Sequence, residues 1–227
     1  PKPQNPVSFK HKILFIKSFL LLNYIFHLTF LIGKISFLVH CSLGDGNNCG
    51  VIIGIFKKYD AILAILLLSK VLQNCYKEII KPQTNKNWIL LIGMFLTGFA
   101  GIVGETWGVK NGFWKYHEVS RELPLWLPFA WMLAFHYLYK LERNLIPLLT
   151  NQIQKNKIIL VLIMAFILPA LGEVITIQLG VWSYYWPYQI LGVPLYAFIC
   201  LVFVHMLVHT ILHFICKKYQ WKDTVFY

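Results

Sequence analysis

Long apolar stretches alternate with short polar segments along this chain. A bilayer core about 30 Å thick needs about 20 helical residues at about 1.5 Å each, so apolar runs of that length predict membrane-spanning helices. Six such runs occur: Phe15–Val39, Tyr59–Tyr76, Trp88–Trp107, Leu123–Leu141, Ile158–Leu179 and Val193–Ile215. The pattern predicts an all-α protein, a polytopic transmembrane helical bundle with about six spans.

Lysine and arginine gather in alternate connections between these runs. They are frequent in both tails and in the connections after the second and the fourth runs. The connections 41–50 and 180–192 contain none, whereas 110–122 is an exception because it holds Lys110, Lys115 and Arg121. Basic connections stay on the cytoplasmic side of a membrane. The distribution therefore predicts a multi-pass membrane protein with both termini in the cytoplasm.

Composition agrees with a lipid environment. Of the 227 residues, 58% are hydrophobic and only 13% are charged, whereas a soluble protein usually has about a quarter charged. This excludes a disordered chain and an ordinary soluble enzyme. The net charge of +12 does not predict nucleic-acid binding, because the basic residues lie between apolar runs and form no stripe. The expected partner of the surface is the membrane lipid bilayer.

A short motif occurs twice, with the second copy 68 residues after the first. Both copies contain Gly-Glu and, after six further residues, Gly-x-Trp-x-Tyr. The matched positions are Gly104, Glu105, Gly112, Trp114 and Tyr116 in the first copy and Gly172, Glu173, Gly180, Trp182 and Tyr184 in the second. Such self-similarity at a fixed offset indicates an internal duplication.

The repeated unit is predicted to be a helix that ends near the Glu, an aromatic loop, and a second helix that opens at Pro124 or Pro194. Each unit holds two spans, so the two copies must share one orientation in the membrane. Three regions follow: 1–86, an N-terminal cytoplasmic tail with two spans; 87–156, the first two-helix repeat; and 157–227, the second repeat with a basic tail.

The two glutamates are the candidate catalytic residues. A carboxylate inside a span costs about 2.5–3.5 kcal/mol, so it normally faces the bundle interior, a cavity or a partner. The duplication places Glu105 and Glu173 at matching depths, where two partly desolvated carboxyl groups can retain a proton for general acid catalysis. In the alternative interpretation, each Glu lies near water or accepts hydrogen bonds from the nearby Trp and Tyr.

The aromatic residues of the motif are the candidate substrate-binding residues: Trp114, Tyr116, Trp182 and Tyr184. Because Trp and Tyr also gather at membrane–water interfaces, an aromatic belt or simple packing is an alternative. Small residues at Gly98, Gly101 and Gly104 predict a close approach of a neighbouring helix to the third apolar run.

Three histidines, His205, His209 and His213, follow one another at intervals of four residues in the last apolar run. This spacing places them on one helical face, where they could ligate a haem or metal, relay protons, or form a polar seam between helices. No metal site is predicted, because no second His pair with a carboxylate completes the set. Cys41 and Cys49 flank a polar loop, and a disulfide and an incidental pair both remain open.

The last 130 residues or so resemble small polytopic membrane proteins of carotenoid biosynthesis. The segment Gly180-Val181-Trp182-Ser183-Tyr184, followed by Ile190-Leu191-Gly192-Val193-Pro194-Leu195, resembles the lycopene cyclases, and Glu105-x-x-Gly108 through Gly112 and Tyr116 resembles the carotenoid hydratase-like proteins. Pro124-Leu125-Trp126-Leu127 with Trp131 is similar to a family of small bacterial membrane proteins of unknown function. The paired Glu-Glu of the cyclases is absent, since Tyr196-Ala197 and Trp126-Leu127 stand there.

The resemblance implies a proton-initiated cyclisation or hydration of a long apolar isoprenoid, for which no cofactor is needed. Glu105 and Glu173 would supply and accept the proton, and the faces of Trp114 and Trp182 would stabilise a carbocation. The alternative class is a non-catalytic membrane subunit that binds a lipid, quinone or haem, or that scaffolds a homo-oligomer or larger membrane complex. A small transporter is a third class, but the interrupted helices of such proteins are not evident.

Overall fold

The computed structural model describes residues 52–82, 85–149, 151 and 153–226. The predicted first span, Phe15–Val39, and the Cys41 and Cys49 pair lie outside the described residues. The described chain is mostly helical, in the order α2 (Asp60–Cys75), α3 (Trp88–Lys110), α4 (Leu127–Leu145), α5 (Gln154–Gln178) and α6 (Leu195–Tyr219). A π-helical turn, Tyr76–Ile80, continues α2, and a 3₁₀ turn, Ile146–Leu148, continues α4.

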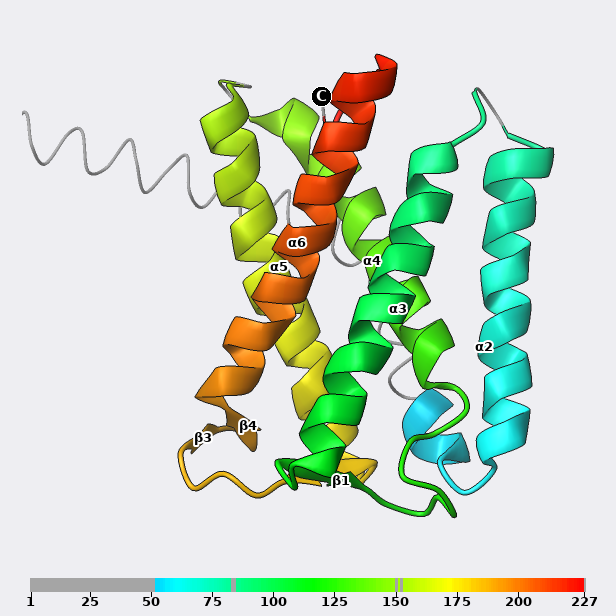
Figure 1. Ribbon diagram of the computed structural model, residues 1–227, viewed down its shortest axis with the longest axis vertical. Helices are drawn as coiled ribbons and strands as arrows, with labels where there is room; N and C mark the ends of the chain where they lie inside the picture. The colour runs from blue at the N-terminus through cyan, green and yellow to red at the C-terminus, as the bar shows by residue number, and fades with distance from the viewer. Residues whose placement is uncertain (1–51, 83–84, 150, 152, 227) are drawn as a thin grey trace, which may run out of the picture. The chain divides into compact units, whose positions relative to one another are not determined.

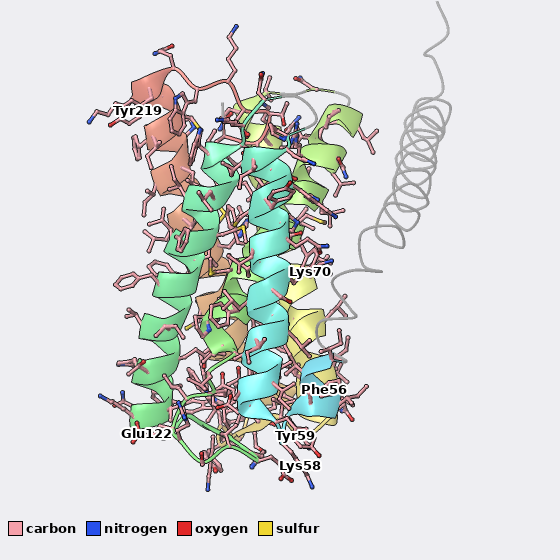
Figure 2. All side chains as sticks on the ribbon, turned by 90° about the vertical axis from the view of Figure 1, so that its right-hand side faces the viewer. Phe56, Lys58, Tyr59, Lys70, Glu122 and Tyr219 are labelled. Atoms are coloured by element: carbon pink, nitrogen blue, oxygen red, sulfur yellow. The ribbon has the colours of Figure 1, made fainter. Side chains whose placement is uncertain are left out.

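The helices lie roughly along one common axis (Figure 1). Helices α3 and α5 run in one direction, and α2, α4 and α6 run in the opposite direction. Tyr59 and Glu122 are therefore at one end of the bundle, and Tyr219 is at the other end (Figure 2). We call the end with Tyr59 the loop end, because the connections after α3 and α5 lie there.

Within the described residues, three helices are long and apolar enough to cross a membrane: α3, α5 and α6. These match the predicted runs Trp88–Trp107, Ile158–Leu179 and Val193–Ile215. Helix α2 has only 16 residues. Helix α4 begins four residues later than predicted and extends through Lys140, Glu142 and Arg143, so it is less apolar than the predicted run.

The start of α4 corrects the predicted role of Pro124. The helix begins at Leu127, and Pro128 is the proline in its first turn. Pro124 lies in the preceding turn, where its carbonyl accepts a hydrogen bond from the amide of Leu127. Pro194 directly precedes α6, as its N-cap. A proline does lie in the first turn of α4, where its missing N–H costs nothing. It is Pro128, however, and not the predicted Pro124.

Helices α3 and α4 approach closely because glycines on α3 receive large side chains of α4. A Cβ atom added at Gly93 would lie 2.2 Å from the Phe135 ring, and one at Gly101 would lie 2.4 Å from the Trp131 ring. At Gly98 it would meet Met132 at 2.9 Å. The predicted close packing is thus present at Gly98 and Gly101.

The C-terminal residues fold back onto the end of the bundle opposite the loop end. The Tyr139 hydroxyl donates a hydrogen bond of 2.6 Å to Asp223 and accepts one of 3.1 Å from the Asn87 side chain. The Phe226 ring stacks on Tyr139 at 5.8 Å and is almost fully buried. The contacts of Asp223 and Phe226 fasten the tail to α4, and the Asn87 hydrogen bond joins the start of α3 to the same tyrosine.

The predicted helical fold is confirmed in its main feature, since the described chain is mostly helical, and two short antiparallel ribbons are added to the helices. Strand β1 (Trp114–Tyr116) pairs with β2 (Trp182–Tyr184), and β3 (Gln189–Ile190) pairs with β4 (Val193–Pro194). The predicted aromatic loops are therefore joined by backbone hydrogen bonds. Three-residue strands are too short to give a period-two signal in the sequence.

Candidate functional site

Helices α3 and α5 end in the same way, and this determines where the motif residues lie. Helix α3 ends at Lys110 and α5 ends at Gln178, and two residues later each chain reaches a glycine with positive φ, Gly112 at 71° and Gly180 at 66°. In both, the glycine amide donates to a carbonyl three residues back and the next amide donates to one five residues back. This Schellman pattern satisfies the last carbonyls and turns the chain sharply.

The turns lead directly into β1 and β2, whose register brings the four motif rings together. Trp114 lies opposite Tyr184, and Tyr116 lies opposite Trp182. Residues two apart on a strand point to the same face, and directly opposed residues share a face. All four rings therefore project from one face of the ribbon.

Glu105 on α3 accepts hydrogen bonds from three aromatic side chains. Its Oε2 accepts from Trp114 Nε1 at 2.8 Å and from the Tyr116 hydroxyl at 2.8 Å, and its Oε1 accepts from Trp131 Nε1 at 3.3 Å. The first two donors come from β1 and the third comes from α4. Helix, ribbon and neighbouring helix are thus tied together at one carboxyl group.

Glu173 on α5 is held in the same manner by the residues of β2. Its Oε2 accepts from Trp182 Nε1 at 3.2 Å and from the Tyr184 hydroxyl at 2.8 Å. No counterpart of Trp131 donates to Glu173 among the hydrogen bonds of the described residues. The two carboxyl groups therefore have different surroundings despite the matching motifs.

The rings also pack across the ribbon, each Trp against the Tyr of the other strand. Trp114 meets Tyr184 edge-on at 5.6 Å, and Tyr116 meets Trp182 edge-on at 5.5 Å. Edge-to-face pairs of this kind add about 0.5–1.5 kcal/mol beyond the burial of their area. In each pair the Trp and the Tyr donate to different glutamates. The side chains that hold Glu105 therefore pack directly on those that hold Glu173.

The two tyrosines outside the helices remain hydrogen-bond donors at physiological pH. Burial raises the pKa of Tyr116 well above its usual value, and the Glu105 carboxylate raises it further. Burial likewise raises the pKa of Tyr184, with Glu173 adding to the effect. Because neither phenol loses its proton, both carboxyl groups keep these donors.

Gly108 allows Trp114 to lie directly against α3. A Cβ at Gly108 would be 1.8 Å from the Trp114 ring, whereas one at Gly104 would meet nothing within 4 Å. We expect Gly108→Ala to displace the ring and destabilise the protein by about 1–3 kcal/mol, as overpacking does. Gly104→Ala is the matched control and should be neutral or stabilising, since Ala favours a helix over Gly. Thermal unfolding in detergent, followed by circular dichroism, checks the difference; equal melting temperatures would contradict this account.

One cavity of about 230 Å³ is lined by both glutamates. Its walls come from α2, α3, α4, α5, α6 and the β1–β2 ribbon, and they are predominantly apolar. Along α4 the lining residues run from Trp126, just before the helix, to Leu141, which is about 22 Å along a helix axis. The cavity is therefore elongated, with the two carboxyl groups towards its loop end.

The predicted aromatic residues divide between the cavity and the packing around it. Tyr116 and Trp182 line the cavity, whereas Trp114 and Tyr184 are not among its lining residues. Trp114 instead packs near Tyr196 at 6.4 Å. The nearby Tyr185 and Trp186 are exposed, as an interfacial belt would require.

Sequence reasoning missed two further tryptophans of this cavity, Trp126 and Trp131. Trp126 is 2% exposed, meets Tyr116 edge-on at 6.1 Å, and has no partner for its Nε1 among the described residues. Both tryptophans belong to the segment that is similar to small bacterial membrane proteins, and this could have marked them as candidates. No sequence spacing, however, relates them to Glu105.

The three histidines of α6 contact two residues outside the helix, Glu142 and Phe226. His205 Nε2 lies 2.8 Å from Glu142 Oε1, His213 Nδ1 lies 2.6 Å from the Phe226 carbonyl oxygen, and the His209 ring packs on the Phe226 ring at 4.9 Å. Within the described part of the chain, no group of three His, Cys, Asp or Glu side chains could hold a metal ion. The histidines thus join α6 to α4 and to the C-terminal residues.

Comparison of the chain with protein-family models, with curated proteins and with solved structures gives no significant match. The function must therefore be argued from the site itself.

Proposed function

We propose that this chain is an integral membrane protein that binds a long apolar, isoprenoid-like molecule in the cavity and acts on it by acid–base chemistry of Glu105 and Glu173. The observation that carries the proposal is that both carboxyl groups line one elongated, mainly apolar cavity. A site with apolar walls and a few convergent polar groups is typical of small-molecule binding. The resemblance to the carotenoid cyclases and hydratases supports the same substrate class.

The proposed reaction is redox-neutral. A protonated carboxyl group donates its proton to one carbon of an alkene, and the π electrons form the new C–H bond, leaving a carbocation on the other carbon. In a cyclisation, a second alkene attacks this cation and a proton is then lost from a neighbouring carbon to the other carboxylate. In a hydration, water attacks instead and loses one proton to that carboxylate.

The hydrogen bonds support a division of roles between the two carboxyl groups. Donors aimed at a carboxyl group favour its ionised form. Glu105 accepts from three side chains and Glu173 from two. Glu105 is therefore the better carboxylate base and Glu173 the better acid. Tyr116, Trp126 and Trp182 line the cavity beside them, and aromatic faces stabilise a cation by about 0.5–2 kcal/mol each.

The proposal extends to topology. We propose six spans in all, with α3–α4 and α5–α6 as a duplicated hairpin in one orientation and both termini cytoplasmic. In support, α3 and α5 run in the same direction (Figure 1), and their ends share one hydrogen-bond pattern. Basic residues also mark the connections at the end opposite the loop end, as in Lys81, Lys86, Lys155 and Lys157.

Expression in a bacterial host that accumulates lycopene, an acyclic isoprenoid, tests the proposed activity. We expect a new pigment that is either an isomer of the starting chain or heavier by one water, seen by chromatography with mass spectrometry. The Glu105→Gln/Glu173→Gln double variant, expressed to the same level in the membrane, should leave the pigment unchanged. An unchanged pigment with the unsubstituted chain as well would count against this substrate class.

A second candidate function is a non-catalytic subunit that binds a lipid or quinone in the same cavity. The observation that favours it is that each Glu accepts a hydrogen bond from the strand that follows its helix. Holding that strand in place is a structural role that needs no catalysis. In that case the double Gln variant would retain binding and function, since an amide oxygen also accepts from Trp and Tyr.

A further inference from the structure

Away from the two glutamates, the same cavity has a second polar region. Thr97 on α3 and His205 on α6 both line the cavity. Thr97 is eight residues before Glu105 on the same helix, which places the two about 12 Å apart along the helix axis. His205 packs against Phe135 at 6.2 Å, and the Phe135 ring lies against α3 at Gly93, still further from Glu105.

This region holds polar groups whose hydrogen bonds are incomplete. The Thr97 hydroxyl is buried and has no partner among the described residues. His205 is paired with Glu142, which is 1% exposed, but the second carboxyl oxygen of Glu142 also has no partner there. Of these groups, Thr97 and His205 line the cavity, and Glu142 lies behind His205 as its partner. Buried polar groups are nearly always satisfied in proteins, so an unpartnered hydroxyl in the cavity wall next to an incompletely bonded pair points to a polar group on the bound molecule.

We propose that this region binds an oxygen-bearing end group, a hydroxyl, of the apolar chain. A hydroxyl is both a donor and an acceptor, so it can accept from Thr97 and donate to the His205–Glu142 pair. The inference rests on the proposed function in one respect, namely that the cavity holds an apolar chain. Among apolar isoprenoid chains, it predicts a preference for those with a hydroxyl about 12 Å from the carbon that meets the two glutamates, while a hydrocarbon of the same class still enters the cavity.

The distance between the polar region and the two glutamates would let the polar region position the bound chain. A purely apolar chain can slide along an apolar cavity, because the hydrophobic effect is not directional. One anchored end fixes which double bond reaches Glu105 and Glu173. The polar region thus selects the reacting carbon without touching it.

Binding of two matched probes tests the proposal on the full chain in detergent micelles. The probes are farnesol, a C15 isoprenoid alcohol, and farnesene, a hydrocarbon with the same number of carbons; tritiated farnesol is bound and each unlabelled compound competes with it. We expect farnesol to bind roughly tenfold more tightly, the effect of one net hydrogen bond. Thr97→Val has nearly the same shape and should weaken farnesol binding severalfold while leaving farnesene binding unchanged.

Two further variants separate this proposal from the proposed chemistry. Glu142→Leu/His205→Leu replaces the whole pair with apolar residues and should abolish the preference for the alcohol. Glu105→Gln/Glu173→Gln should keep the preference even though it lacks the proposed acid and base. Equal binding of the two probes by the unsubstituted chain, or an unchanged preference in Thr97→Val and the Leu double variant, would overturn the polar anchor. Binding of neither probe would overturn the apolar-chain site itself.

Discussion

Replacing Glu173 with Gln is expected to reduce product formation by a factor of about 10²–10⁴, the usual contribution of a general acid. Gln retains an oxygen that accepts from Trp182 and Tyr184, so the ribbon and the cavity keep their geometry. It cannot supply the proton that starts the reaction. The measurement is product per unit of membrane-inserted protein in the lycopene-accumulating host.

Tyr184→Phe is the matched control for this loss. It removes one hydrogen bond to Glu173 but leaves the acid and the ring that packs on Trp114. Product formation should fall much less than in Glu173→Gln. Equal losses in the two variants, or full activity in Glu173→Gln, would show that Glu173 acts by holding the ribbon and not by donating a proton.

Much of the site could be predicted from the sequence because it depends on a local pattern. Glu105 and its two donors from β1 lie within twelve consecutive residues, and the same spacing recurs at Glu173. A helix that ends at a glycine has few ways to turn, so identical spacing leads to identical geometry. Both carboxyl groups also line one cavity, which is a non-local arrangement that a short motif cannot specify by itself.

The residues that were missed are positioned by packing between distant parts of the chain. Trp131 reaches Glu105 only because Gly101 lets α4 lie close to α3. Glu142 lies one residue beyond the predicted fourth run, Leu123–Leu141, and is 1% exposed. Its partner His205 is 63 residues away. No periodicity or spacing in the sequence relates such residues, since their contact depends on how the helices cross.

The largest effect on stability is expected at this Glu142–His205 pair. Removal of one member of a buried pair leaves the other without its partner and typically costs about 3–5 kcal/mol. Glu142→Leu alone should therefore lower the melting temperature in detergent markedly. In this variant His205 loses its hydrogen bond to Glu142 Oε1, and no other hydrogen bond of its ring joins it to the described residues.

The double variant Glu142→Leu/His205→Leu should recover most of that loss. Two apolar side chains of similar volume need no hydrogen bonds, and such replacements of buried pairs are often neutral or even stabilising. A double-mutant cycle of melting curves then gives the coupling between the two positions. If the losses of the two single variants simply add up in the double variant, the interaction between Glu142 and His205 contributes little to stability. Strong coupling, with stability regained and the preference for the alcohol lost, would mean that the pair is kept for binding at a site where a simple apolar core would be at least as stable.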